Sequence, residues 1–114
     1  MGYDRGDVVI GYDKFKQRSD GRPFLIISDE ETPFHGEQYI TLSLTTRTWY
    51  EDRIPIEESD WVTGGAPRSS SIMPWSVNSI SADEIDIKQG TLTEPIIARA
   101  TEQLSEYLLN QRLQ

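Results

Sequence analysis

Two residues in this chain have side chains that suit chemistry on a phosphate group, and both stand at the ends of predicted strands. Arg22 comes directly before Pro23, whose ring holds the preceding residue extended. A guanidinium in such a place can pair with two phosphate oxygens and stays charged. Thr45 ends an apolar run, and a strand hydroxyl can donate a hydrogen bond to a developing oxyanion. Residue type alone leaves two other readings open, a solvated charge at Arg22 and an ordinary β-branched strand residue at Thr45.

Other common kinds of catalytic and metal site are excluded by composition. The chain has no cysteine and one histidine, His35, so it offers no thiolate site, no disulfide, no histidine-based zinc cluster and no Ser-His-Asp triad. The acidic runs at residues 29–31, 51–52 and 57–60 lack the ligand spacing of a calcium loop and are expected to be solvated. We therefore expect no metal and no cofactor, and chemistry that depends on arginine, carboxylate, hydroxyl and backbone amide groups.

Length and composition predict one domain over residues 1–114. No apolar run approaches the roughly 20 residues that span a bilayer, and the amino terminus lacks the basic and then apolar layout of a signal peptide. These features indicate a cytoplasmic protein without a membrane segment.

The charge of the chain is unevenly distributed. A formal net charge of −8 argues against a simple nucleic-acid binder. Residues 14–22 nevertheless hold four basic side chains (Lys14, Lys16, Arg18 and Arg22) and one acidic side chain, Asp20, so that +4 − 1 = +3 locally. This segment is the candidate for contact with a phosphate backbone.

The hydrophobic pattern predicts a mainly β fold with a carboxy-terminal helix. Strands are expected at residues 8–12 and 24–28, and in the run YITLSLTT at residues 39–46. In that run Leu42 and Leu44 should face the core, which leaves Thr45 pointing away from it.

The later part of the chain contains prolines that restrict its strands. Pro55 predicts an edge strand at residues 53–57, and Pro74 demands an edge or a bulge in a strand at residues 70–77. Residues 81–84 have capping-box spacing and predict a short helical turn, and residues 88–92 are expected to turn the chain back. An amphipathic helix should run from near Pro95 to about Asn110. Together these elements predict a small, strongly bent antiparallel sheet or barrel closed by a helix.

Three motifs in the first half of the chain support a more specific interpretation. A Gly-Asp-Val-Val entry at residues 6–9, an Arg-Pro pair opening a hydrophobic strand at residues 22–23, and a strand ending in threonines at residues 45–46 occur in this order and spacing. The set resembles the opening half of the MazF/PemK family of small endoribonuclease toxins, and the similarity extends more weakly to about residue 109.

The resemblance implies an SH3-like barrel with a C-terminal helix that forms a homodimer. It also implies that the protein cleaves single-stranded RNA in a sequence-selective, metal-independent way, and that a cognate antitoxin holds the toxin inactive. Arg22 and Thr45 match the catalytic arginine and threonine of the family, with Thr46 as the alternative hydroxyl if a bulge shifts the face. The other hypothesis is a non-catalytic SH3-like barrel that binds a protein or peptide partner.

Candidate RNA contacts lie between these motifs and after them in the sequence. Aromatic rings at Phe15, Trp49 and Trp75 could stack on bases, although Trp75 is expected in the core. The family commonly has Gln-x-Arg-Thr where residues 76–79 here read Ser-Val-Asn-Ser, so phosphate contacts must come from elsewhere, with Arg47 and Arg68 as candidates. The predicted RNA-binding set is Lys14, Phe15, Lys16, Arg18, Arg47 and Arg68.

Overall fold

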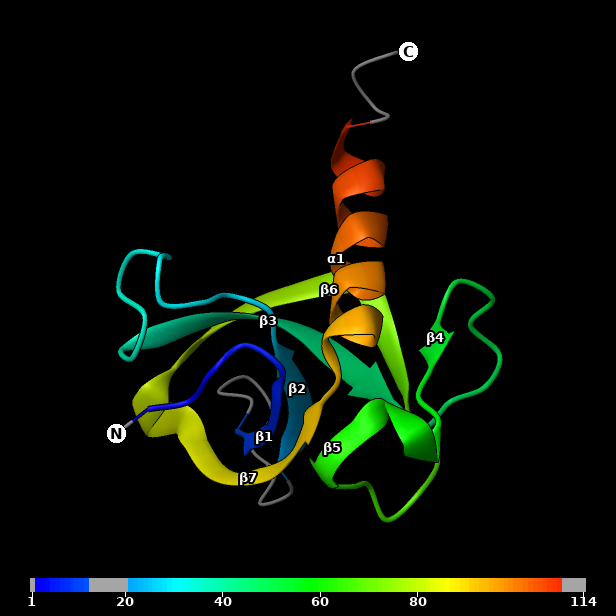
Figure 1. The fold of residues 1–114 in the computed structure, drawn as a ribbon, viewed down its shortest axis with the longest axis horizontal. Helices are drawn as coiled ribbons and strands as arrows, with labels where there is room; N and C mark the ends of the chain where they lie inside the picture. Colours follow the sequence, from blue (N-terminus) through cyan, green and yellow to red (C-terminus); the bar gives the residue numbers. More distant parts are fainter. Residues whose placement is uncertain (1, 13–20, 110–114) are drawn as a thin grey trace.

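The structure, a computed structural model, describes residues 2–12 and 21–109 of the chain (Figure 1). Within these residues one antiparallel sheet has the strand order β4-β6-β3-β2-β1-β7-β5. The elements are β1 (Asp7–Gly11), β2 (Arg22–Ile26), β3 (Gln38–Thr45), β4 (Ile54–Pro55), η1 (Glu58–Asp60), β5 (Trp61–Gly64), β6 (Ser71–Ser81), η2 (Ala82–Glu84), β7 (Ile85–Leu92) and α1 (Glu94–Leu109). This mainly β architecture with a C-terminal helix confirms the predicted fold class.

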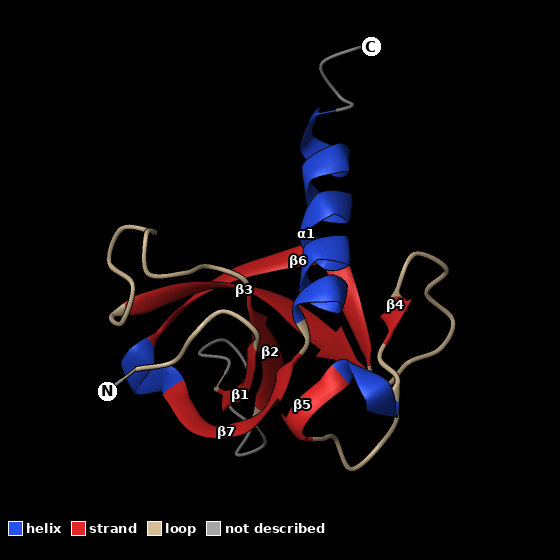
Figure 2. Cartoon of the chain, viewed as in Figure 1, coloured by secondary structure: helices blue, strands red, loops and turns tan. Residues whose placement is uncertain are grey.

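The sheet curls into a half-barrel, with β4 and β5 as its edge strands (Figures 1 and 2). The first turns of α1 pack against the body of the molecule, and the rest of the helix projects beyond the sheet (Figure 2). Among the helices in the described part of the chain, none has the length and apolar character needed to cross a bilayer.

The central strands are packed on both faces. Val8 of β1 and Leu25 of β2 belong to one hydrophobic cluster, which α1 covers, whereas the alternate residues Val9 and Phe24 belong to a second cluster. Leu42 and Leu44 enter the first cluster as predicted, together with Ile54, Ile72, Leu92, Ile96, Ile97 and Ala100.

The second cluster changes the environment of the hydroxyls on β3. Thr41 alternates with the core leucines and is nevertheless fully buried, because the opposite face of the strand is covered too. Its hydroxyl donates to the carbonyl oxygen of Asn78 at 3.2 Å, which satisfies the hydrogen-bonding requirement of a buried polar group.

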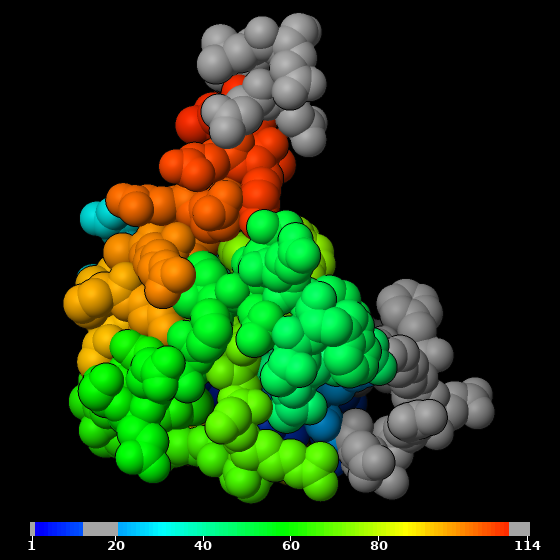
Figure 3. Space-filling model, turned by 90° about the vertical axis from the view of Figure 1, so that its right-hand side faces the viewer, coloured from blue at the N-terminus to red at the C-terminus, as the bar shows by residue number. Residues whose placement is uncertain are grey.

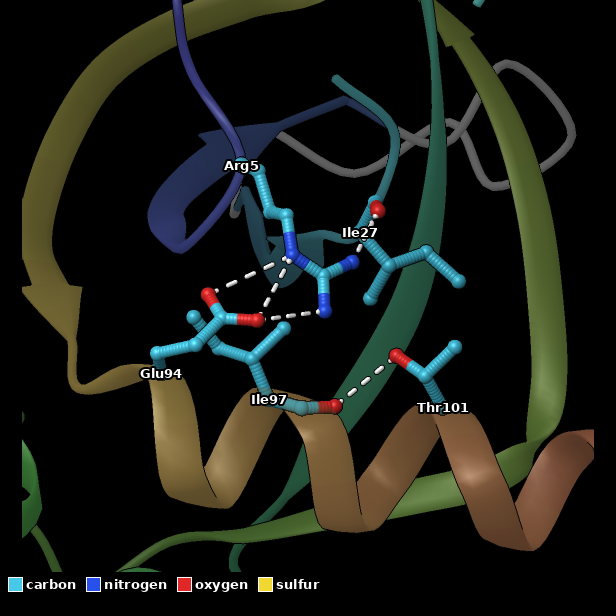
Figure 4. A network of polar contacts seen from close by, with 5 residues as sticks. All are labelled: Arg5, Ile27, Glu94, Ile97 and Thr101. Atoms are coloured by element: carbon cyan, nitrogen blue, oxygen red, sulfur yellow. Dashed lines mark hydrogen bonds and ion pairs between the residues drawn. The ribbon is translucent and has the colours of Figure 1, made fainter.

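The turn that leads into β1 is held by three consecutive residues. Arg5 donates to the carbonyl oxygen of Ile27 at 2.6 Å and pairs with Glu94, the first residue of α1, at 2.8 Å (Figure 4). Gly6 has a φ of +99°, and a Cβ at this position would lie 2.8 Å from a side chain of α1. The buried carboxylate of Asp7 accepts hydrogen bonds through both oxygens. The Arg-Gly-Asp run therefore ties the amino terminus to β2 and α1.

Several predicted elements are confirmed. The helical turn predicted at residues 81–84 is η2, whose N-cap Ser81 donates its N–H to the Glu84 carboxylate at 3.3 Å. β4 contains Pro55 and lies at an edge of the sheet. β6 continues past Pro74 because its pairing with β3 is irregular there: Leu44 pairs with Ile72, whereas Leu42 pairs with Val77.

Two parts of the prediction differ from the structure. The turn expected at residues 88–92 is wrong, because these residues continue β7 and pair with β1 on one side and with β5 on the other. The strand β5 itself was not predicted. Gly90 suggested a turn, but in the sheet it makes room for a neighbouring strand: a Cβ there would lie 2.5 Å from the carbonyl oxygen of Thr63.

Candidate active site

A pocket of about 420 Å³ opens where the outer ends of β2 and β3 face the segment entering β6. On this face the link between β3 and β4 protrudes beside a hollow (Figure 3). We call this pocket the arginine pocket, because the described residues that line it include two arginines and neither a carboxylate nor an imidazole. The lining residues are Arg22, Pro23, Leu44, Thr45, Thr46, Arg47, Tyr50, Ser70 and Met73.

Strand register brings Arg22 and Thr45 to the same pocket. β2 and β3 pair antiparallel, with Phe24 opposite Ser43, so continuing this register by two residues sets Arg22 opposite Thr45 on the same face. Gly21 lets β2 approach β1 closely, since a Cβ at that position would collide with the side chain of Ile10. Arg22 is exposed, and its side chain makes no hydrogen bond or ion pair with any residue in the described ranges.

The hydroxyl of Thr45 is oriented by the backbone. Its Oγ1 accepts a hydrogen bond from the N–H of Arg47 at 3.1 Å. Because the oxygen is the acceptor in this bond, the hydroxyl hydrogen remains available for a ligand in the pocket. Thr46 also lines the pocket, and its role as the alternative hydroxyl stays open.

Arg47 connects the pocket to exposed aromatic side chains. Its Nη1 donates to the Tyr50 hydroxyl at 3.2 Å, and its guanidinium lies 5.5 Å from the centroid of the Trp49 ring. Tyr50 in turn contacts Trp49 and Trp75, with centroid distances of 5.8 and 5.6 Å. We call Trp49, Tyr50 and Trp75 the aromatic cluster.

The position of Trp75 differs from the one that the sequence predicts, and Tyr50 is a pocket residue that no sequence motif singled out. Trp75 was expected in the core but is 40% exposed, because it lies in the irregular part of β6. Tyr50 was not considered, although it lies within the run Arg-Thr-Trp-Tyr that follows the two threonines. Its proximity in sequence to Thr45 and Thr46 is the signal that could have identified Tyr50 as a site residue.

The remaining candidate RNA contacts are placed differently. Arg68 lines a separate pocket of about 310 Å³, in which Glu57 and Glu58 are also present. Ser70 lines both this pocket and the arginine pocket, so the two are adjacent. The candidates Lys14, Phe15, Lys16 and Arg18 lie outside the described residues.

The segment that departs from the family pattern holds a neutral polar network. Ser43 Oγ accepts hydrogen bonds from Ser76 Oγ at 3.1 Å and from Asn78 Nδ2 at 2.7 Å. These uncharged groups bond to one another and supply no cation where the family commonly has an arginine. The second guanidinium of the pocket comes instead from Arg47.

The segment between β3 and β4 also lies near α1. Desolvation by partial burial raises the pKa of Tyr107 above its ordinary value, and the carboxylates of Asp52 and Glu106 raise it further.

No family model matches this chain, and no curated protein matches it significantly. Solved structures match over nearly its whole length. A mycobacterial endoribonuclease in complex with its cognate antitoxin is similar with a TM-score of 0.66 and 19% identity, over 96% of this chain and 94% of that chain. The Mycobacterium tuberculosis toxin MazF-mt6 gives a TM-score of 0.62 and 15% identity, over 91% and 96% of the two chains.

A third structure agrees with these two. A chain of the MazE-MazF complex from Deinococcus radiodurans gives a TM-score of 0.71 and 14% identity, over 95% of this chain and 96% of that chain. At such low identity the likeness concerns the backbone arrangement. The chain therefore has the fold of the MazF endoribonuclease toxins.

Proposed function

We propose that this chain is a sequence-selective, metal-independent endoribonuclease that cleaves single-stranded RNA and acts in the cytoplasm as the toxin of a toxin–antitoxin pair. The observation that carries the proposal is the arginine pocket. In a chain with a net charge of −8, the described residues that line it include Arg22 and Arg47 and no carboxylate. A pocket of this composition suits an anion such as a phosphodiester. The shared fold with endoribonuclease toxins supports the same reaction in one domain over residues 1–114.

The reaction is an attack of the RNA 2′-hydroxyl on the adjacent phosphorus. The 2′-oxygen bonds to phosphorus, the bond to the 5′-oxygen breaks, and negative charge builds on the nonbridging oxygens. Arg22 pairs with these oxygens through its planar fork, and Thr45 donates its hydroxyl hydrogen to one of them. Both interactions strengthen as charge develops, so they lower the barrier more than they stabilise the bound substrate.

In this mechanism, hydroxyl groups and water transfer the protons. The 2′-hydroxyl loses a proton and the leaving 5′-oxygen gains one, and no histidine, carboxylate, lysine or cysteine is found among the described lining residues. The available exchanging groups are the hydroxyls of Thr45, Thr46, Tyr50 and Ser70, together with solvent. The expected products are a 2′,3′-cyclic phosphate and a 5′-hydroxyl, and DNA, which lacks the attacking group, should not be cut.

The RNA strand would extend from the pocket along neighbouring basic residues. Arg47 holds a phosphate beside the scissile one, and Arg68 holds the next, since their pockets share Ser70. Lys14, Lys16 and Arg18 lie outside the described residues; from the local charge of their segment they are proposed to bind the phosphate backbone, and Phe15 to stack on a base.

The test is a cleavage assay with purified protein and single-stranded RNA in EDTA, with mapping of the cut ends. We expect cleavage at selected sites with cyclic-phosphate ends, and loss of cleavage in Arg22→Ala. A 5′-phosphate product or a requirement for divalent metal would refute the mechanism. Absence of cleavage by the wild type at low and at high salt would favour the alternative, a barrel that binds a peptide.

We also propose that the chain forms a homodimer and binds an antitoxin. Ile40 of β3 and Val77 of β6 are exposed by 40% and 46%. They share the face of Leu42, because Ile40 is two residues away and Val77 is its direct partner, and their exposure means that α1 leaves this part of the face uncovered. A second copy on this face would bury both. Light scattering at micromolar concentration should give twice the 13.0 kDa chain mass, and Val77→Lys should give a monomer.

A further inference from the structure

Exposure of the aromatic cluster is unusual for rings that pack on one another. Trp49 is 69% exposed and Trp75 is 40% exposed, yet both contact Tyr50. Large apolar side chains gathered on a surface commonly mark a binding site. Mutual contact also fixes the orientation of the rings, which lowers the entropy lost when a ligand stacks on them.

The aromatic cluster and the arginine pocket form one continuous surface. Tyr50 belongs to both, since its ring contacts the two tryptophans and its side chain lines the pocket. Arg47 also lines the pocket, while its guanidinium lies over Trp49. A ligand that fills both places must have an anionic group joined at short range to a flat ring.

We propose that the aromatic cluster is a base-stacking site, in which an unpaired nucleobase of the RNA lies against Trp49 while its own phosphate occupies the arginine pocket. This inference rests on the proposed function and names the position at which the enzyme holds one nucleotide. A nucleotide joins phosphate and planar base covalently, as the adjoining surfaces require. Arg47 covers one face of the Trp49 indole, and the high exposure of Trp49 leaves area on the ring for a base.

Stacking of this kind selects unpaired strands over duplexes. A base can lie flat on Trp49 only after it leaves its stack, and every base offers a π face. The site should therefore accept all four bases and favour single-stranded RNA. Selection of the cut sequence must then depend on other contacts.

The experiment measures binding without cleavage. Single-stranded 2′-O-methyl RNA, in which the attacking hydroxyl is blocked, is titrated against the wild type and Trp49→Ala. A second set of oligonucleotides carries one abasic position, moved along the strand. We expect Trp49→Ala to raise the Kd by about tenfold. One abasic position should weaken binding to the wild type by a similar factor and have little further effect on Trp49→Ala.

Phe34→Ala is the matched control. Phe34 is 65% exposed, close to the value for Trp49, and lies in the loop between β2 and β3, outside the arginine pocket. The Phe34→Ala variant should bind the oligonucleotides as the wild type does. Trp49→Phe, which keeps an aromatic face, should restore most of the affinity, and thermal melts of each variant check folding.

The outcomes separate this inference from the proposed function. If the wild type cleaves RNA but the abasic penalty is equal in the wild type and Trp49→Ala, stacking is refuted and the endoribonuclease proposal stands. If the abasic penalty depends on Trp49 but the protein does not cleave RNA, the stacking site is supported and the catalytic proposal fails. If Trp49→Ala weakens binding of an antitoxin peptide and leaves RNA binding unchanged, the cluster is a protein-binding surface and the inference is wrong.

Discussion

Two pockets of similar size differ in the charges that line them. The arginine pocket has a volume of about 420 Å³, and its lining, as far as the structure describes it, contains two arginines and no carboxylate. A second pocket of about 490 Å³, at the start of α1, contains Arg99 together with Glu57 and Asp60; its other lining residues are Pro55, Pro95 and Ile96. We call it the mixed-charge pocket. Volume therefore does not distinguish a candidate site in this molecule, whereas the charge of the lining does.

The comparison shows how an acidic protein can present a site for an anion. With 19 acidic and 11 basic residues, most hollows on the surface should include a carboxylate. In the mixed-charge pocket, and in the pocket of Arg68, carboxylates offset the arginine. Among the described residues, no carboxylate lines the pocket at the ends of β2 and β3, so none of these residues offsets the charge of Arg22 and Arg47 there.

The largest expected effect is the difference in cleavage rate between two variants, each of which lacks an arginine from one of the two pockets. Arg22→Ala should lower the cleavage rate at saturating RNA by about 10³, because its best interaction forms in the transition state. Arg99→Ala should leave the rate unchanged. Arg22→Lys should recover only part of the loss, since an ammonium keeps the charge without the planar fork. Single-turnover rates measure all three, and an equal loss in the Arg22 and Arg99 variants would contradict the distinction.

A smaller effect is expected from the hydroxyl in the arginine pocket. Thr45→Val should lower the rate by about 10², the typical cost of one donor to an oxyanion. It should also cost about 1 kcal/mol of stability, because the N–H of Arg47 loses its acceptor. Denaturant unfolding measures the second effect, and Thr45→Ser, which keeps the hydroxyl, should largely restore the rate. If Thr45→Val retains full activity, Thr46 becomes the candidate hydroxyl.

A third arginine, Arg5, pairs with a carboxylate, and we expect it to have a structural role and no role in catalysis. Arg5 is held by Glu94 and by the carbonyl oxygen of Ile27. Arg5→Ala should lower the free energy of unfolding by about 1–2 kcal/mol while the rate per folded molecule stays unchanged. Glu94→Gln should cost less, because the carboxylate is 64% exposed. Thermal and denaturant unfolding measure the loss, and a change in rate without a change in stability would assign Arg5 to the site instead.

The smallest expected effect concerns the salt dependence of RNA binding. Arg47→Ala should reduce the slope of log K against log salt concentration by about 0.7, the value for one phosphate contact with a single strand. Arg68→Ala should reduce it by less, because Glu57 and Glu58 line the same pocket. Titrations of 2′-O-methyl RNA at several salt concentrations give both slopes. A larger change for Arg68 would mean that the strand follows the other pocket.

The local elements of this protein could be predicted from residue patterns. Alternation in β3, the capping box before η2 and the helical spacing after Pro95 each act over a few residues, so the sequence carries them directly. The strand β7 could not be found this way. Gly90 has the local signature of a turn, and only the approach of β5 explains a glycine there.

The chain by itself determined which side chains could act on a phosphate, since arginines and hydroxyls remain once cysteine is absent and histidine occurs once. It also determined the resemblance that singled out Arg22 and Thr45. Tertiary structure decided that these two meet, because their meeting depends on the register between β2 and β3 across a separation of 23 residues, 45 − 22 = 23. It likewise decided that Arg47 and Tyr50 join them, that Arg68 lies apart, and that Trp75 is exposed. Those outcomes follow from how distant strands pack, and no short stretch of residues encodes them.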